Sequence, residues 1–261
     1  MADETNDKGS RSLRSLAVLE AIVAHGGVAS TGEVMSASGL PKATVHRICA
    51  LLEREGYLRR DSVGRGLVTG FRLDRLALGI LSGPGHRRLT HAILESLAAE
   101  IRETCNLNVP DGGRMLYVDR VEAEWPLRLQ LPVGTRVPLH CTASGKLFLS
   151  TLPSTELRLM LKTLKLERHT ANTSTSIEDL EKRLAVIRSE GIGTDDEEFL
   201  DGMTAVAVPV VDDLGRLCAT LAVHAPSVRM SLADARSHVP ALRRAARQLA
   251  IAMGIAREAA Q

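Results

Sequence analysis

Long hydrophobic runs are absent from this chain of 261 residues. No apolar stretch reaches the roughly 18 residues that a membrane-spanning helix needs. The opening residues, MADETNDKGS, are polar and acidic, and they lack the apolar core of a signal peptide. We therefore expect a cytoplasmic protein without a membrane partner.

Cysteine is scarce, and the four cysteines stand far apart in the sequence. Cys49, Cys105, Cys141 and Cys218 form no CxxC pair, which argues against a zinc site. A cytoplasmic location argues against disulfides. We therefore expect neither a bound metal nor another cofactor.

A large excess of one charge is missing too, since 33 Lys/Arg and 31 Asp/Glu give a formal net charge of +2. This balance excludes a protein that coats nucleic acid along its whole length. The basic surplus lies in the first third of the chain, where residues 8–70 carry nine Lys/Arg and five Asp/Glu, a net +4. Binding to DNA should therefore be local. A hydrophobic content of 44% is enough for one large domain or two ordinary ones.

Two helices separated by a short turn are predicted near the start of the chain. Ser30 has Glu33 three residues on, which is the spacing of a capping box, and Gly39 suits the left-handed end of the first helix. Pro41 is expected at the first position of the second helix, which Gly56 closes. This order is typical of a helix-turn-helix that binds DNA.

The second of these helices has two contrasting faces. Val45, Ile48, Cys49 and Leu52 form an apolar stripe. The opposite face is small and basic, and Arg47 has the forked guanidinium that can contact guanine or a phosphate. An ordinary solvated helix face is the alternative. We predict DNA contacts from this helix and from the hairpin after it, at Lys42, Ala43, Thr44, His46, Arg47, Arg54 and Arg65.

A hairpin is predicted directly after the helix-turn-helix. Its strands are residues 57–61 and 66–70, and its tip is Ser62-Val63-Gly64-Arg65. A hairpin in this place is typical of a winged helix. Arg59, Arg60 and Arg65 would then contact the DNA backbone.

Two further helices are predicted on either side of the winged helix. Residues 71–81, FRLDRLALGIL, spread apolar side chains around much of a linker helix, which Ser82-Gly83-Pro84-Gly85 ends. This linker helix either joins two subunits or is buried within its own chain, and the pattern favours neither. The helix before the motif has Ser12 as its expected cap. Its apolar stripe, expected to pack beneath the motif, is Leu13, Leu16, Val18, Leu19, Ile22 and Val23.

The rest of the chain predicts a mixed α/β domain. Turn residues separate short apolar strands, so an antiparallel sheet covered by helices is expected. The fold class is therefore α+β, with a DNA-binding domain at 8–70, a linker helix at 71–84 and a second domain at 85–261. The expected strands of this domain are 107–109, 115–121, 127–133, 204–211 and 217–224. One helix is expected at 89–101, two more begin at the caps Ser154 and Ser176, and a last helix is expected at 240–259.

A small-ligand site is predicted at His140 to Lys146, where the run TASGK at 142–146 begins another helix. Its small side chains leave backbone N–H groups uncovered, and such a helix start suits a carboxylate. Alternatively, these residues only allow close packing of the helix on the sheet, with Thr142 as the cap. The acidic run at 195–198 is interpreted as a solvated or capping cluster rather than a metal site.

Two enzymatic alternatives were weighed on these residue types. One pairs Cys141 with His140 or His224, and the other pairs Ser144 with Lys146. Neither matches a known nucleophile signature, so we predict that the chain is not an enzyme. An architectural DNA-binding protein without a ligand leaves the large second domain unexplained.

Several collinear segments resemble the IclR family of bacterial transcription regulators. The resemblance implies a winged helix, a linker helix that dimerises and a GAF-like effector domain that often tetramerises the protein. Within the family it points to the repressors of γ-butyrolactone breakdown. The matching segments are GLPKATVHRICALLEREGYL at 39–58, YVDRVE at 117–122, VGTRVPLHCTASGK at 133–146, GIGTDDEE at 191–198 and VAVPVVDDLG at 206–215.

The resemblance also implies where an effector binds. Ala205, Ala222 and His224 stand where small-acid binders of the family often carry Cys or Ser, which weakens any copied ligand assignment. His224 is expected either to donate to an effector oxygen or to be a structural residue. Together with the uncovered amide of Gly145, the predicted effector positions are Ala143, Ser144, Gly145, Asp195, Met203, Ala205, Ala222 and His224.

We therefore predict a homo-oligomeric transcription regulator, a dimer or a tetramer, that binds a roughly palindromic double-stranded DNA operator. Its expected action is repression of a catabolic operon. A small organic acid, a semialdehyde or a lactone-derived effector would release it. An activator of the same type that responds to an aromatic acid is the alternative.

Overall fold

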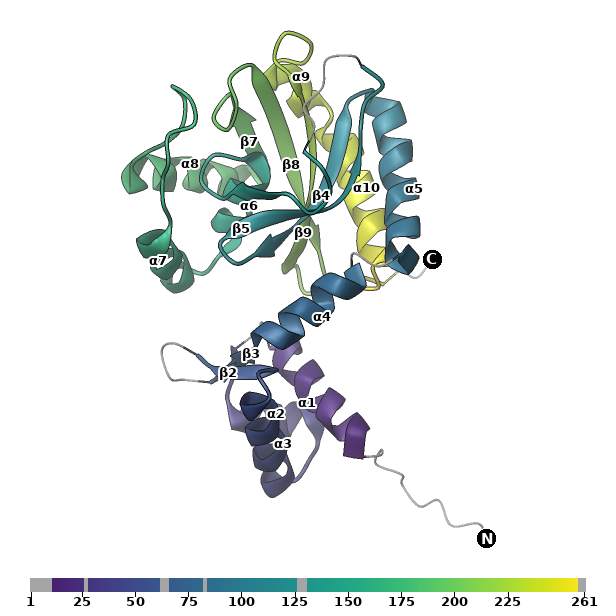
Figure 1. Cartoon of the computed structure of the whole chain (residues 1–261), viewed down its shortest axis with the longest axis vertical. Coiled ribbons are helices and arrows are strands. Elements are labelled where there is room, and N and C mark those ends of the chain that lie inside the picture. The colour runs from purple at the N-terminus through teal and green to yellow at the C-terminus, as the bar shows by residue number, and fades with distance from the viewer. Residues whose placement is uncertain (1–10, 26–27, 62–65, 82–83, 126–130, 258–261) are drawn as a thin grey trace. The chain divides into compact units, whose positions relative to one another are not determined.

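The computed structural model describes residues 11–25, 28–61, 66–81, 84–125 and 131–257 (Figure 1). The chain divides into two compact units, Met1–Ile80 and Leu81–Gln261. Within the described residues, no helix is long and apolar enough to cross a membrane.

The first unit is a small helical domain with a three-stranded sheet. The sheet has the order β1-β3-β2, with antiparallel pairing throughout. Asp61 N–H donates to the carbonyl of Gly66 at 3.0 Å and closes the β2–β3 hairpin. The elements are α1 (Arg11–Ala24), β1 (Val28–Ala29), α2 (Thr31–Ser38), α3 (Lys42–Arg54), β2 (Leu58–Arg60), β3 (Leu67–Thr69) and α4 (Phe71–Leu81).

The predicted end signals of α2 are confirmed. Glu33 N–H donates to Ser30 Oγ at 3.3 Å, and Ser30 N–H donates to the Glu33 carboxylate at 2.7 Å, which is a complete capping box. Gly39 has φ 64°, the left-handed conformation that ends the helix. Pro41 is the N-cap of α3 rather than its first residue, so that prediction is wrong by one position.

Helix α1 buries less of its apolar surface than its sequence predicts. Val18 and Ile22 are buried in the core of the unit and Leu19 packs against it. Three other apolar side chains are exposed, because α2, α3, β1 and β3 cover one side of the helix only. The expected cap Ser12 lies inside α1, which already includes Arg11, so that prediction is wrong. The exposed side chains are Leu13, Leu16 and Val23.

The second unit is built on a six-stranded antiparallel sheet of order β6-β5-β4-β9-β8-β7. Helices α5 and α10 contact one another and cover one face, while α6 packs on the other face and against α8 (Figure 1). The elements are α5 (Pro84–Ile101), β4 (Thr104–Asp111), β5 (Arg114–Val121), β6 (Arg136–Pro138), α6 (Ala143–Thr151), α7 (Ser154–Thr163), α8 (Ile177–Glu190), β7 (Gly193–Asp196), β8 (Met203–Val211), β9 (Leu217–Pro226), α9 (Leu232–Ser237) and α10 (Val239–Ala252).

Some predicted elements of this unit are displaced. The strand expected at 127–133 falls partly on residues outside the described ones, and residues 131–133 are not a strand, because the pairing with β5 starts at Arg136 instead. Pro153, rather than Ser154, is the N-cap of α7. Helix α10 ends at Ala252, seven residues before the expected end at 259.

Two glycines allow helix α6 to begin very close to the sheet. A Cβ on Gly193 in β7 would lie 2.1 Å from the carbonyl oxygen of Ala143, and a Cβ on Gly145 would lie 2.4 Å from Cα of Leu139. Both distances are impossible for any other residue without moving the backbone. The N-terminus of α6 is therefore held against β7, where the predicted ligand site begins.

Candidate functional site

The outward face of α3 has the composition that a DNA-reading helix needs. Val45, Ile48, Cys49 and Leu52 are buried, as predicted. On the other side, Arg47 is exposed and makes no ion pair with any described residue, so its guanidinium is available to a ligand. Of the other predicted DNA contacts, Thr44 is half-buried and the exposed ones are Lys42, Ala43, His46 and Arg54.

Two basic residues near this face are held by neighbouring acids. Arg54 Nε lies 3.3 Å from Glu55, and Arg60 Nε lies 3.1 Å from Glu53. Such exposed pairs are weak, and a phosphate can replace the carboxylate. Arg65, predicted at the tip of the wing, lies outside the described residues.

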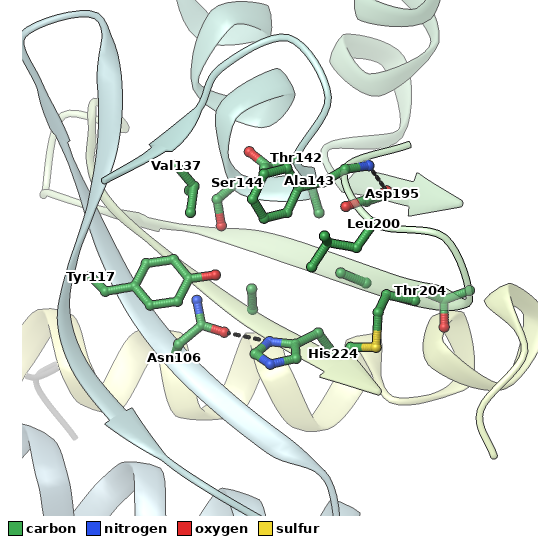
Figure 2. A pocket seen from close by; sticks show the side chains of 14 residues that line it. Asn106, Tyr117, Val137, Thr142, Ala143, Ser144, Asp195, Leu200, Thr204 and His224 are labelled. Atoms are coloured by element: carbon green, nitrogen blue, oxygen red, sulfur yellow. Dashed lines mark hydrogen bonds between the residues drawn. The ribbon is translucent and has the colours of Figure 1, made fainter. Parts of the chain in front are cut away.

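A cavity lies on the sheet face that α6 covers (Figure 2). Its volume is about 40 Å³, which is room for only a few waters. Seven of the eight predicted effector residues line it, so the structure brings together positions from α6, β7, β8 and β9. These seven are Ala143, Ser144, Asp195, Met203, Ala205, Ala222 and His224.

Gly145 is the exception among the predicted effector positions. Its N–H donates to Thr142 Oγ1 at 3.1 Å, so the prediction that this amide is uncovered is wrong. The close approach to Leu139 explains the glycine, as the packing alternative proposed. Because first-turn amides have no partner within a helix, the N–H groups of Ala143 and Ser144 remain for a ligand.

A chain of buried polar groups crosses the floor of the cavity. Asn108 Nδ2 donates to Ser144 Oγ at 2.9 Å, and Asn106 Nδ2 donates to Asn108 Oδ1 at 2.9 Å. The Asn106 oxygen then accepts from His224 Nδ1 at 3.0 Å. Ser144 keeps its own hydroxyl proton for a ligand.

His224 ends this network, with its Nδ1 facing the Asn106 amide oxygen. With the proton on Nδ1, Nε2 is an acceptor, and it has no hydrogen-bond partner among the described residues. Burial, assisted by the Arg120 cation, lowers the pKa of His224 to about 3, so the ring stays neutral. The hydrogen bond to Asn106 gives His224 a structural role, and the expectation that it also donates to an effector oxygen stays a prediction.

Asp195 and Tyr117 set the charge of the cavity. Asp195 Oδ1 accepts the N–H groups of Glu198 at 2.8 Å and Phe199 at 3.3 Å. Burial outweighs these hydrogen bonds and raises the pKa of Asp195 to about 7. Burial also raises the pKa of Tyr117 to about 12, so its hydroxyl stays protonated.

A buried ion-pair cluster lies behind Asp195. Lys146 Nζ donates to Glu198 Oε1, which also lies 3.2 Å from Arg183. The side chains of Lys146 and Glu198 are 1% and 2% exposed, so Asp195 and Glu198 are not part of a solvated cluster. The capping alternative is confirmed for Asp195, which accepts two backbone N–H groups. The cations paired with Glu198 come from α8 and from α6, and Lys146 of α6 is 52 residues away in the sequence. Lys146 is committed to Glu198, so it forms no catalytic pair with Ser144.

Several residues of the cavity were not predicted. Asn106 and Tyr117 lie in strands β4 and β5, where a polar residue within a buried strand was the only available signal. The others are Val137, Phe199, Leu200 and Thr204, while Thr142, which also lines the cavity, is the predicted cap of α6.

Both units of the chain match models of a single protein family. Residues 80–251 match the family model described as "Bacterial transcriptional regulator IclR C-terminal", and residues 13–62 match the "IclR helix-turn-helix domain". The chain belongs to the IclR family. Its members are DNA-binding transcriptional regulators rather than enzymes. The predicted family and the prediction that the chain is not an enzyme are therefore both confirmed.

Relatives of the IclR family match this chain over almost its full length. The probable transcriptional regulator SauR of Cupriavidus necator is 41% identical, over 94% of this chain and 97% of its own. The transcriptional repressor IclR of Escherichia coli is 27% identical, over 84% and 80%. The crystal structure of Thermotoga maritima IclR superposes with a TM-score of 0.62 at 27% identity, over 93% and 98%. The chain is thus a ligand-responsive IclR-type regulator, and the γ-butyrolactone subgroup stays a prediction.

Proposed function

We propose that this regulator represses a catabolic operon in the cytoplasm and releases its operator when a short organic acid, a semialdehyde or a lactone-derived compound fills the α6 cavity. The observation that carries the proposal is the cavity itself, with two first-turn amides at one end. Relatives named as repressors, such as that of E. coli, support repression over activation. A repressor needs only to occlude a promoter until its ligand arrives.

The cavity favours a ligand with one acceptor end and one donor group. The Ala143 and Ser144 amides would hold carboxylate or carbonyl oxygens. Ala205, Ala222 and Met203 would border a short carbon chain. The unpartnered Nε2 of His224 would accept a hydrogen bond from a hydroxyl on the ligand, because a buried acceptor left unpaired costs about 1–3 kcal/mol.

An activator that responds to an aromatic acid is the second candidate. Because the cavity holds only a few waters, a six-membered ring needs a larger movement of the lining side chains than a short aliphatic acid does. A thermal-shift screen of hydroxy acids, semialdehydes, lactones and aromatic acids separates the two ligand classes. Stabilisation by aromatic acids alone would overturn the proposed ligand, and transcription assays with the hit would distinguish repression from activation.

Substitution of Arg47 should weaken preferential operator binding while the fold stays intact. Arg47 is exposed on the face opposite the buried stripe of α3, and a bidentate base contact is worth about 1–3 kcal/mol of discrimination. We expect Arg47→Ala to lose about 5- to 150-fold in the ratio of operator to random-DNA affinity. Arg47→Lys keeps the charge but not the fork, so it should recover general affinity without the discrimination. If Arg47→Ala bound the operator as tightly as the wild type across a salt series, the exposed face of α3 would not be the surface that contacts DNA.

Binding of a carboxylate ligand should depend on pH through Asp195. Asp195 is neutral below its pKa of about 7 and anionic above it, where it repels a second carboxylate in the same cavity. Calorimetry from pH 6 to 8 should therefore show affinity falling with rising pH, by at most about tenfold per unit. Asp195→Asn should flatten the profile, and an uncharged lactone should show no such fall. An equally steep profile in Asp195→Asn would assign the titration to another group.

We also propose that the regulator acts as a dimer or tetramer on a roughly palindromic operator. Apolar side chains on α4, Phe71, Leu76 and Ile80, are exposed in the single chain, as are three on α1. A twofold reader places its helices about 34–36 Å apart, or at multiples of one turn. Light scattering at micromolar concentration should give at least twice the 28.1 kDa chain mass. A monomer that binds one half-site with full affinity would contradict this.

A further inference from the structure

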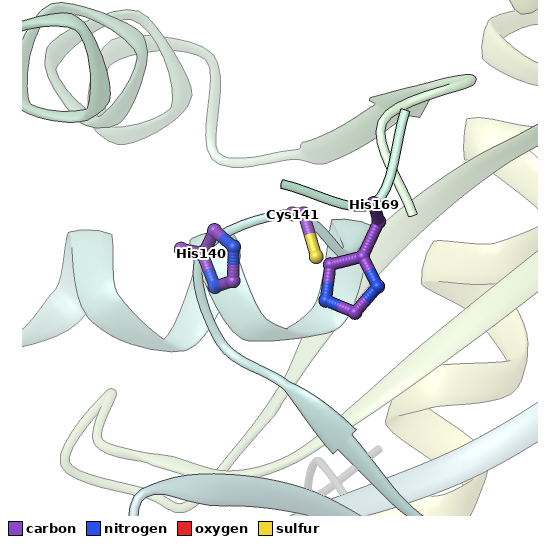
Figure 3. A group of neighbouring side chains, drawn as sticks. All are labelled: His140, Cys141 and His169. Carbon is purple, nitrogen blue, oxygen red and sulfur yellow. The ribbon is translucent and has the colours of Figure 1, made fainter. Parts of the chain in front are cut away.

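Three side chains that the effector cavity does not use form a compact cluster of metal-binding atoms (Figure 3). One ring nitrogen each of His140 and His169 and the sulfur of Cys141 all lie within 4.8 Å of one another. His140 and Cys141 precede helix α6, and His169 lies in the segment between α7 and α8. The two imidazole centroids are 5.9 Å apart. The sequence does not reveal this cluster, because the cluster contains no CxxC motif and His169 is distant from His140 and Cys141 along the chain.

The hydrogen bonding of His140 prepares one nitrogen for a ligand. Its Nε2 lies 2.9 Å from the carbonyl oxygen of Glu167, which only accepts, so Nε2 carries the proton. Nδ1 then holds a free lone pair. That atom is buried, in a side chain 1% exposed, and makes no hydrogen bond to any described residue. A histidine whose other N–H donates to a backbone carbonyl is the usual arrangement of a metal ligand.

We propose that His140, Cys141 and His169 bind one divalent metal ion, Zn²⁺ or a similar ion such as Co²⁺. Two imidazoles and one thiolate suit Zn²⁺, and tetrahedral coordination places the nitrogens at about 2.0–2.1 Å and the sulfur at about 2.3 Å. On binding, Cys141 Sγ exchanges its proton for the metal, and the proton leaves to solvent. The three atoms would draw together around the ion, and His169 is the exposed member of the cluster. A water molecule would fill the fourth position.

An entry path and a structural consequence follow from the surroundings. A surface groove lined by His140, Glu167 and His169 reaches the two histidines of the cluster. The ion would tie the segment of His169 to the start of α6. His169 also packs edge-on against Phe199, a cavity-lining residue, with 5.4 Å between ring centroids. The metal would thereby stiffen one wall of the effector cavity, although the inference does not depend on what that cavity binds.

Cobalt and zinc titrations of the full, untagged and reduced chain test the site. Co²⁺ should bind with one ion per chain and give a sulfur-to-cobalt charge-transfer absorption, because the proposed set includes a thiolate. Zn²⁺ should displace the cobalt and raise the midpoint of thermal unfolding in a concentration-dependent way. Absence of the charge-transfer absorption in the wild-type chain would overturn the proposal.

Matched variants locate the binding. His169→Gln, at an exposed position, should keep the fold and weaken Zn²⁺ binding at least about tenfold. Cys141→Ser should remove the charge-transfer absorption. His25→Gln alters an exposed histidine of the other unit, and Cys218→Ser alters a half-buried thiol outside the cluster, so both should bind as the wild type does. Equal Zn²⁺ affinity in His169→Gln and the wild type would contradict the site.

Discussion

Replacing Ala222 with leucine is expected to abolish the response to the effector. Ala222 is 4% exposed in the middle of β9 and lines the cavity, where it packs near Ala143 and Ala207. A leucine there adds three carbons to a space that holds only a few waters, so ligand and side chain cannot both fit. Calorimetry should show at least a hundredfold loss of effector affinity, with operator affinity in the absence of ligand unchanged. Ala222→Val should give an intermediate loss.

The control for this variant is Ala225→Val on the same strand. Side chains alternate between the faces of a sheet, so Ala225 points away from the cavity that Ala222 and His224 line. Ala225→Val should bind the effector normally, and its melting temperature reports the cost of added bulk in this strand. Wild-type effector affinity in folded Ala222→Leu would move the effector site elsewhere in the molecule.

Removal of the Glu198 carboxylate is expected to give the largest loss of stability. Glu198→Ala leaves the Lys146 ammonium, whose side chain is 1% exposed, without its hydrogen-bonded partner. Breaking a buried pair on one side costs about 3–5 kcal/mol. For a unit of this size the melting temperature should fall by roughly 6–20 °C, measured by calorimetry.

A double variant separates this ion-pair effect from a loss of packing. Lys146→Met with Glu198→Leu replaces both charges by apolar groups of similar size, which is often neutral or stabilising. Arg183, half exposed at its side chain, can turn to solvent. The double variant should therefore be more stable than Glu198→Ala. If the double variant were as unstable as Glu198→Ala, the loss of stability would not come from the unpaired Lys146 charge.

Sequence patterns predicted the parts of the fold whose causes are local. The capping box at Ser30, the glycine exit at Gly39 and the cap at Ser176 each depend on residues within four positions, and each occurs as predicted. The turn at residues 212–215 between β8 and β9 is also found, with Gly215 at φ 75°. The short strands β1 and β7 have no such signal and were missed, because neighbouring strands stabilise them. Helix α9 was missed although Ser231 and Asp234 form a capping box at its start.

The polar chemistry of the second unit depended on contacts that the sequence does not display. Asp195 and Glu198 look like a solvated acidic run until α6 brings Lys146 next to them. His224 looks like a donor until Asn106, more than a hundred residues earlier, accepts from its Nδ1. An accepting Nε2, as we propose, would change the expected ligand from a compound that only accepts hydrogen bonds to one that also carries a donor.

Operator binding measured with and without the effector found by the screen tests the central claim most directly. If the cavity controls the DNA-binding unit, the effector must favour one of two arrangements of the protein, with a coupling of about 1–3 kcal/mol. At fixed salt, a saturating effector should therefore weaken operator affinity of the wild-type chain by about 5- to 150-fold, and Ala222→Leu should show no change. Identical operator affinity with and without a bound effector in the wild-type chain would contradict the account.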